Sequence, residues 1–320
     1  MLRYLLLFTL YFHSGGNAKT LYETNLKRFL ERHPIKKDPH DCEKIAHMEG
    51  IWRYNHRKDT AGINDRISII RQLLDLSAAT CSRLMFPIPC KTLTEKHNRY
   101  KDYNRTLSCD HSWNHYIQLS HPWLLIELNG TESIGSEQFD YFNVPYFYSW
   151  KPGREEIRKL PQKVVHVNTT SQQDAFADSI IRNQGAKDDF YVLHVRRTDV
   201  KKLCDTRVHK VLEHVKEILR NDTVAPAYLF YMTDETDRQY NKKLMQALEA
   251  TPKILKVVHV DPVVRNVLKN EPKVDNYFAY QVAKAIARKS KVFIELTHKG
   301  RCPKTLYFPY TMMYSGTNRK

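Results

Sequence analysis

Several sequence signatures of common protein classes are missing from this chain of 320 residues. No apolar run reaches the ~20 residues that a membrane-spanning helix needs, so no stable membrane span is expected. There is no Gly-x-x-x-x-Gly-Lys phosphate loop and no His-Glu-x-x-His zinc motif, which argues against P-loop and zincin chemistry. None of the six cysteines has a C-x-x-C partner, so cysteine-bound zinc is not expected.

The composition fits a globular protein. The hydrophobic fraction is 42% and the aromatic fraction 11%, which suits a packed core of one or two domains. The formal net charge of +16 attracts polyanions such as anionic lipid, sulfated glycans and nucleotide phosphates. The basic residues are scattered, which favours a solvated basic surface. No nucleic-acid recognition module is found, so nucleic acid is not expected as a partner.

The first residues indicate a compartment. Residues 1–18 combine Arg3, the apolar run Leu5–Phe12 and the small residues Ser14–Ala18, which is typical of a secretory signal peptide; an uncleaved anchor is the alternative. We therefore expect a protein of the secretory-pathway lumen (endoplasmic reticulum or Golgi) or a secreted one. An even number of cysteines indicates disulfides, whose connectivity the sequence leaves open. Four sequons predict a glycoprotein: Asn104, Asn129, Asn168 and Asn221.

The first half of the chain contains one clear unit of two strands and a helix. A strand is expected at Ile51–Tyr54, a glycine turn at Gly62–Arg66, and a helix over 67–81, where the apolar residues have helical spacing. Another strand, Arg83–Pro87, completes the βαβ unit. Residues 90–162 are irregular and rich in Pro, Asn and aromatics, and we expect loops and short helices there.

In the second half, apolar runs of strand length alternate with helical patterns, which predicts a parallel sheet covered by helices. The expected fold class is α/β with two Rossmann-like domains: residues 19–160 after the signal peptide, then 161–320, with a linker near Lys151–Gly153 or Pro161. The strands are expected at 163–167, Phe190–Val195, Ala227–Met232, Ile254–Val260 and Lys291–Ile294, and the helices at Val208–Leu219, Asn241–Ala250 and Tyr277–Arg288.

The strand Phe190–Val195 carries the strongest chemical signal. It delivers His194 and the pair Arg196-Arg197 to its carboxyl end, where open α/β sheets bind their ligands. The planar guanidinium group of arginine matches phosphate with two hydrogen bonds. One arginine can reach a phosphate while the other pairs with an acid such as Asp199. The alternative is a surface arginine pair with a local salt bridge.

The segment His194-Val-Arg-Arg-Thr-Asp199 resembles the first nucleotide-sugar motif of the α1,6-fucosyltransferases, including the rhizobial nodulation enzymes. The looser H-x-R-x-x-D pattern is shared with the protein O-fucosyltransferases. Three further blocks resemble this clan's other motifs in the same order, and together they span most of the chain: Gly62–Arg66, Tyr231–Glu235, and the helix from Asp275 with the strand Lys291–Ile294.

This resemblance implies a GT-B fold whose first domain lies on the acceptor side and whose second domain binds the GDP-sugar across a cleft. It implies GDP-fucose as donor, a glycan or glycoprotein as acceptor, and an inverting transfer that needs neither metal nor cofactor. Arg196 would stabilise the charge growing on the departing GDP, with Arg197 assisting. His194 and Asp199 would support the pyrophosphate or sugar, Asn64 and Arg66 would face the cleft, and Asp234 and Glu235 would lie near nucleotide or acceptor.

Two departures from the family pattern affect the predicted chemistry. The α1,6 enzymes carry a glutamate after the motif that can serve as base, and Cys204 stands at that position here with Asp205 beside it. Asp205 is therefore a candidate for this position, and Asp199 is a further catalytic candidate; the identity of the base stays open. Glu295–Arg301 stands in place of a serine-rich phosphate turn, and Thr297 is our candidate there for donor binding. The alternative function is a catalytically inactive protein of the same fold that binds glycans or glycosaminoglycans.

Two further features of the acidic residues bear on metal and on structure. Asp234 and Asp237 do not have the Asp-x-Asp spacing of the metal-dependent transferases, so no metal site is expected. The pair Asp234-Glu235 has an alternative role as the cap and first-turn charge of a helix.

Overall fold

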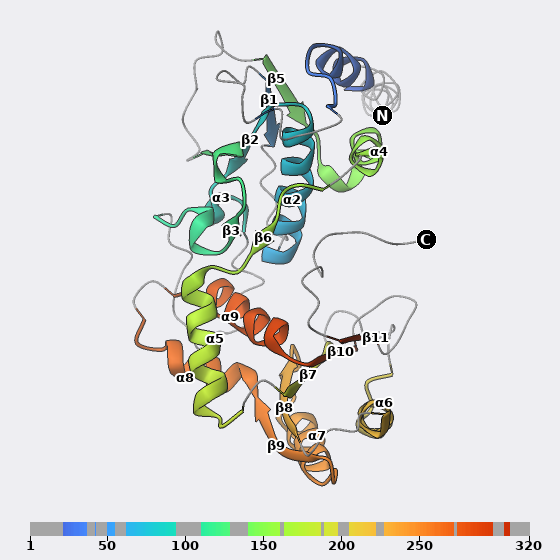
Figure 1. Ribbon diagram of the computed structural model, residues 1–320, viewed down its shortest axis with the longest axis vertical. Coiled ribbons are helices and arrows are strands. Elements are labelled where there is room, and N and C mark those ends of the chain that lie inside the picture. The colour runs from blue at the N-terminus through green and yellow to red at the C-terminus, as the bar shows by residue number, and fades with distance from the viewer. Residues whose placement is uncertain are drawn as a thin grey trace, which may run out of the picture. The chain divides into compact units, whose positions relative to one another are not determined.

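The computed structural model divides by its internal contacts into two compact units, Met1–Asn168 (unit 1) and Thr169–Lys320 (unit 2) (Figure 1). The division falls a few residues after the boundary expected at 160/161. The predicted signal peptide lies outside the described residues. Among the described residues, no helix has the length and apolar character needed to cross a membrane. The described residues are 22–36, 42, 50–54, 62–93, 110–128, 140–160, 163–186, 189–197, 205–221, 227–271, 274–296 and 304–307.

Unit 1 contains a four-stranded parallel sheet in the order β4-β2-β1-β5. Strand β1 (Gly50–Tyr54) leads through helix α2 (Ile63–Ala79) to β2 (Arg83–Pro87), which confirms the predicted βαβ unit. Strands β4 (Leu125–Leu128) and β5 (Asp140–Val144) lie in the stretch where we expected only loops and short helices. That expectation was wrong because these strands have only 4 and 5 residues, too few for a clear periodic pattern.

The other elements of unit 1 correct two further expectations. Lys151–Gly153, one of the two expected linker positions, forms the first turn of a helix, and only the end of the predicted strand 163–167 is paired, antiparallel to β3. A helix covers residues 22–32. The remaining elements are α3 (Pro89–Thr92), η3 (Trp113–His115), β3 (Gln118–Leu119), η4 (Pro122–Leu124), η5 (Phe147–Ser149), α4 (Lys151–Lys159) and β6 (Val167–Asn168).

Aromatic side chains fill the core of unit 1. The ring of Trp52, on β1, lies 4.7 Å from Phe29 and 5.2 Å from Phe142, and Phe142 lies 5.7 Å from Trp150. The buried indole N–H of Trp52 donates to Thr80 Oγ1 at 2.9 Å, so its polar atom is satisfied as burial requires. These contacts tie the N-terminal helix, the sheet and the start of α4 together.

Disulfides are present, as predicted. Cys42 is bonded to Cys81, which follows α2 with a positive φ of 47°. The bridge therefore joins the segment after the N-terminal helix to the end of α2. Cys90 is also disulfide-bonded, and its partner lies outside the described residues.

Asp75, on α2, is a carboxylate inside unit 1. It is 1% exposed and accepts the backbone N–H of Val165 at 3.1 Å, while its second oxygen has no hydrogen-bond partner among the described residues. Burial raises the pKa of Asp75 to about 6, against the opposing influence of backbone N–H groups and of Arg71 and Lys163. At neutral pH the ionised carboxylate of Asp75 therefore destabilises the folded protein.

Unit 2 contains a five-stranded sheet in the order β11-β10-β7-β8-β9. Its strands are parallel except β11, which is antiparallel to β10. The predicted strands and helices here are confirmed, whereas α5, α8 and β11 were not predicted. The elements are α5 (Ser171–Asn183), β7 (Phe190–Val195), α6 (Val208–Asn221), β8 (Ala227–Thr233), α7 (Arg238–Glu249), β9 (Ile254–His259), α8 (Val260–Leu268), α9 (Asn276–Lys289), β10 (Val292–Leu296) and β11 (Lys304–Tyr307).

Helices cover both faces of this sheet, with α6 and α7 on one side and α5, α8 and α9 on the other (Figure 1). Alternate strand residues divide between the faces. Leu193 and Leu229 pack with Val215 and Leu244 of α6 and α7. Two Rossmann-like units, each built on a parallel sheet, confirm the predicted α/β class. That the units face each other across a cleft stays a prediction.

The substitution Asp75→Asn tests the buried carboxylate. The pKa of about 6 in the folded protein lies above the ordinary 3.8, so the contribution of Asp75 to stability is most favourable below about pH 4 and is lost as the pH rises through 6. We expect Asp75→Asn to raise the free energy of unfolding by about 1 to 3 kcal/mol at pH 7.5 and to change it little at pH 4.5. Urea unfolding at both pH values measures this. Asp189→Asn, at an exposed position, is the control, and an equal loss of stability at both pH values would contradict the assignment.

Candidate functional site

In both sheets the chain builds strands outward on one side of the first strand and then returns to its other side. In unit 2 the chain runs from β7 outward to β8 and β9, and then returns to β10 on the other side of β7. In unit 1 it runs from β1 to β2 and β4, and returns to β5 on the other side of β1. Open α/β sheets bind ligands at the carboxyl ends of the strands where this reversal occurs. In unit 2 that point lies between β7 and β10.

Arg197, directly after β7, is held in place by three interactions. Its guanidinium group forms an ion pair of 3.0 Å with Glu235 and stacks 3.7 Å from the centre of the Tyr240 ring, which is a cation–π contact. Its backbone N–H donates to Asp234 Oδ1 at 2.6 Å. Burial raises the pKa of Tyr240 to about 12, with Arg197 opposing the shift. The partner of Arg197 is thus Glu235, and the expected local acid, Asp199, lies outside the described residues.

Arg196 differs from its neighbour in exposure. It is exposed, whereas Arg197 is half-buried. The two arginines thus differ in that Arg197 is ion-paired with Glu235 and half-buried, whereas Arg196 is exposed at the strand end. The ligand role of Arg196 stays a prediction.

The acidic segment after β8 has mainly a supporting role. Asp234 accepts the N–H of Arg197, and Glu235 accepts the backbone N–H of Asp237 at 2.9 Å in addition to its ion pair. The cap of α7 is Asp237, which accepts from Gln239 N and Tyr240 N. The alternative role of Asp234 and Glu235 as helix cap and first-turn charge is therefore wrong, because the N-cap of α7 lies three residues after Asp234.

His194 lies near the end of β7 among charged neighbours. Its ring stacks with that of Phe293 on β10, with centroids 6.2 Å apart. Burial lowers the pKa of His194, while Glu295, Asp234 and Asp261 act to raise it and Arg196 to lower it. Because the net shift is downward, the imidazole is neutral at neutral pH and offers one donor and one acceptor.

Asp205, our candidate base, precedes α6 and is exposed. It receives hydrogen bonds from the side chain and backbone of Arg207, which lower the pKa of Asp205 to about 2. A carboxylate with so low a pKa is ionised but weakly basic, and proton abstraction is most efficient when the pKa is close to the working pH. Thr297 and Asp199 lie outside the described residues, so their roles stay predictions.

In unit 1, Arg66 is part of the core. It is 1% exposed, and it donates to Thr92 O at 3.0 Å and to Tyr54 Oη at 2.9 Å. Asn64, in the same first turn of α2, is exposed. The neighbouring Asp65 was not among our candidates, yet its carboxylate accepts a hydrogen bond from the half-exposed Tyr148 at 3.2 Å. No local pattern links these two residues, because they are far apart in the sequence.

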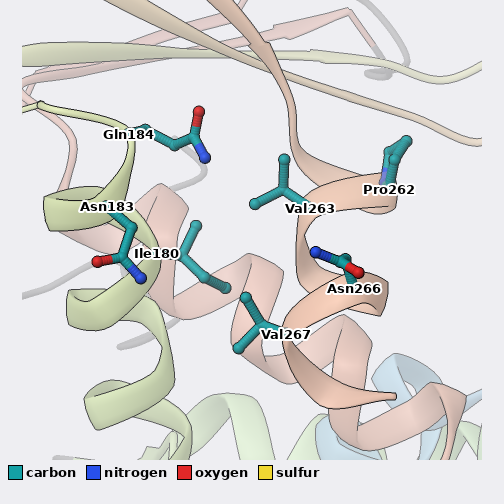
Figure 2. A pocket seen from close by; sticks show the side chains of 7 residues that line it. All are labelled: Ile180, Asn183, Gln184, Pro262, Val263, Asn266 and Val267. Atoms are coloured by element: carbon teal, nitrogen blue, oxygen red, sulfur yellow. The ribbon is translucent and has the colours of Figure 1, made fainter.

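A hollow of about 390 Å³ lies elsewhere in unit 2, between α5 and α8. Figure 2 shows its apolar floor of Ile180, Val263 and Val267. Pro262 and the amides Asn183, Gln184 and Asn266 complete the lining. None of these residues is charged, so this hollow does not have the chemistry of a phosphate site.

No metal centre is found among the residues that the structure describes, where no group of three or more His, Cys, Asp and Glu side chains could hold an ion. The expectation of a metal-independent reaction stays a prediction.

Comparison with known proteins gives a structural likeness and no sequence match. No protein-family model matches the chain, and no curated protein matches its sequence. Among solved structures, the fucosyltransferase NodZ from Bradyrhizobium is similar, with a TM-score of 0.44 and 9% sequence identity over 82% of this chain and 100% of that one. This similarity is too low to assign a function, which must come from the residues themselves.

The different surroundings of Arg196 and Arg197 can be tested by measuring the stability of their alanine variants. Arg197→Ala removes an ion pair and a cation–π contact, and we expect it to lower the free energy of unfolding by about 1 to 3 kcal/mol. Arg196→Ala, at an exposed position, should cost about 0.5 kcal/mol or less. Urea unfolding of both variants measures the difference. A double-mutant cycle of Arg197→Ala with Glu235→Ala should show coupling, and equal losses for the two arginines would contradict the assignment.

Proposed function

We propose that this protein is an inverting, metal-independent fucosyltransferase that moves fucose from GDP-fucose to a glycan or glycoprotein acceptor in the secretory-pathway lumen. The observation that carries the proposal is the arginine pair at the carboxyl end of β7, with Arg197 fixed by Glu235 and Arg196 exposed. It stands where the strand order reverses, within a segment that resembles the donor motif of this enzyme class. The NodZ likeness adds no weight of its own.

The proposed chemistry follows from this arrangement. The acceptor hydroxyl oxygen attacks the anomeric carbon of fucose, the bond from that carbon to the β-phosphate oxygen breaks, and its electron pair leaves with GDP. The proton of the hydroxyl passes to a base. Arg196 stabilises the charge that grows on the β-phosphate, and a fixed donor does so without reorganisation during the reaction.

Arg197 contributes through position. Its backbone is bonded to Asp234 and its side chain to Glu235, so the peptide that carries Arg196 is held at the strand end. A preorganised group costs less to align with a developing charge. In the proposal, His194 and Thr297 also contact the donor, Asn64 and Arg66 belong to the acceptor-side domain, and Asp199 is the base candidate preferred over the weakly basic Asp205.

The alternative is a catalytically inactive glycan- or glycosaminoglycan-binding protein of the same fold. The net charge of +16 and Cys204 at the position of the family's glutamate favour it. An anionic glycan would bind by charge, so its affinity would fall steeply with salt.

Substitution of Arg196 tests the proposal directly. We expect Arg196→Ala to reduce both GDP affinity and fucose transfer or GDP-fucose hydrolysis by about 100-fold or more, because a charge-assisted contact to phosphate is lost. Arg196→Lys should restore part of the loss. Calorimetric GDP binding and release of GDP from GDP-fucose measure the two effects.

The control is Arg182→Ala, which removes an exposed arginine from α5 of the same unit and should leave both measurements unchanged. If the purified protein binds GDP and Arg196→Ala alters neither binding nor turnover, the proposal fails. Retention on heparin with no GDP binding would support the alternative.

A further inference from the structure

The second strand reversal lies in unit 1, between β1 and β5. The two strands are parallel, and their last residues, Tyr54 and Val144, are paired. Open α/β sheets bind ligands at such an edge. The chain after β5 continues into η5, and the next described element after β1 is α2. A ligand at this edge of unit 1 would therefore meet side chains from η5 and from the first turn of α2.

The segment after β5 places two tyrosine rings together. Phe147, between them in the sequence, is buried, whereas Tyr146 is half-buried and Tyr148 is 41% exposed. The two tyrosine rings lie 5.7 Å apart in an edge-to-face arrangement. A single exposed aromatic ring is ordinary on a protein surface. Tyr148 differs from such a ring because two neighbours fix its position, Tyr146 and a carboxylate.

That carboxylate belongs to Asp65, in the first turn of α2. Its Oδ1 atom accepts a hydrogen bond from the hydroxyl of Tyr148 at 3.2 Å. Asp65 is itself exposed, and an ionised carboxylate can accept about four hydrogen bonds, so the tyrosine leaves acceptor positions for a ligand. Burial raises the pKa of Tyr148, as does the Asp65 carboxylate, so the hydroxyl keeps its proton and remains a donor at physiological pH.

An exposed aromatic ring that is hydrogen-bonded to an exposed carboxylate matches the chemistry of a sugar. A pyranose has an apolar face of C–H groups, which packs against an aromatic ring, and hydroxyl groups, which donate to a carboxylate. A sulfated or sialylated sugar fits less well, since its negative charge would lie close to Asp65. We propose that Tyr148 and Asp65 bind one uncharged sugar ring of the acceptor, with the apolar face on Tyr148 and hydroxyl groups on Asp65. As a description of the acceptor, this rests on the proposed function.

Binding of the full chain to an array of neutral, sialylated and sulfated glycans tests this sugar site. The unmodified protein should bind neutral glycans in preference to the charged ones. Tyr148→Ala should weaken binding to the best neutral glycan by about tenfold or more, because the ring contact is lost. Asp65→Asn should weaken it by about tenfold, because hydrogen bonds to a charged acceptor are lost. Tyr148→Phe keeps the ring and should retain more affinity than Tyr148→Ala.

Two exposed residues of unit 1 provide matched controls. Trp123→Ala removes an exposed ring from η4, which precedes β4 and so lies at the amino end of that strand. Glu155→Gln neutralises an exposed carboxylate on α4. Both controls should leave glycan binding unchanged. The calorimetric affinity for GDP, whose site is proposed in unit 2, should be the same in every variant.

Failure of the sugar site and failure of the proposed function give different results. If the unmodified protein binds GDP but no neutral glycan, or if Tyr148→Ala and Asp65→Asn keep full glycan binding, the sugar site is overturned while the proposed function stands. A preference for sulfated or sialylated glycans overturns the sugar site as well. If neutral glycans bind through Tyr148 but GDP does not bind, the proposed function fails and the sugar site stands without an acceptor role. Should Tyr148→Ala not fold, Tyr148→Phe and Asp65→Asn decide.

Discussion

The ion pair between Arg197 and Glu235 is the interaction on which the candidate site depends. It joins the carboxyl ends of β7 and β8 at 3.0 Å, and the stacking of Tyr240 at 3.7 Å closes the guanidinium from one side. An arginine at a strand end is costly to desolvate unless its charge is matched. Arg197 is matched inside the protein by Glu235, while the adjacent Arg196 is exposed at the same edge of the sheet.

In unit 1, which has the same strand order, the arginine near the strand ends is buried. There, Arg66 is buried and its donors are directed to Thr92 O and Tyr54 Oη, so the guanidinium binds the end of β1 to the helix after β2. Both units thus use an arginine near the carboxyl ends of parallel strands to hold the chain in place, as Arg66 does in one and Arg197 in the other. The difference is the second arginine, which only the sequence after β7 supplies at this position.

The sequence predicted what depends on local pattern and failed where the cause is distant. Strands β7 and β8 are continuous apolar runs, and both were found. The polar helix α5 was missed, although its capping box between Thr170 and Gln173 is a local signal that could have revealed it. The acid that pairs with Arg197 was expected nearby, at Asp199. It is Glu235, brought close by the parallel pairing of β7 with β8, and no sequence pattern encodes that contact.

Burial affects the charge of the groups at the strand reversal of unit 2. Burial lowers the pKa of His194 in spite of three carboxylates that act to raise it, so this histidine carries no charge at neutral pH. The positive charge at this strand end therefore comes from the arginines, whose charge does not change with pH in the physiological range.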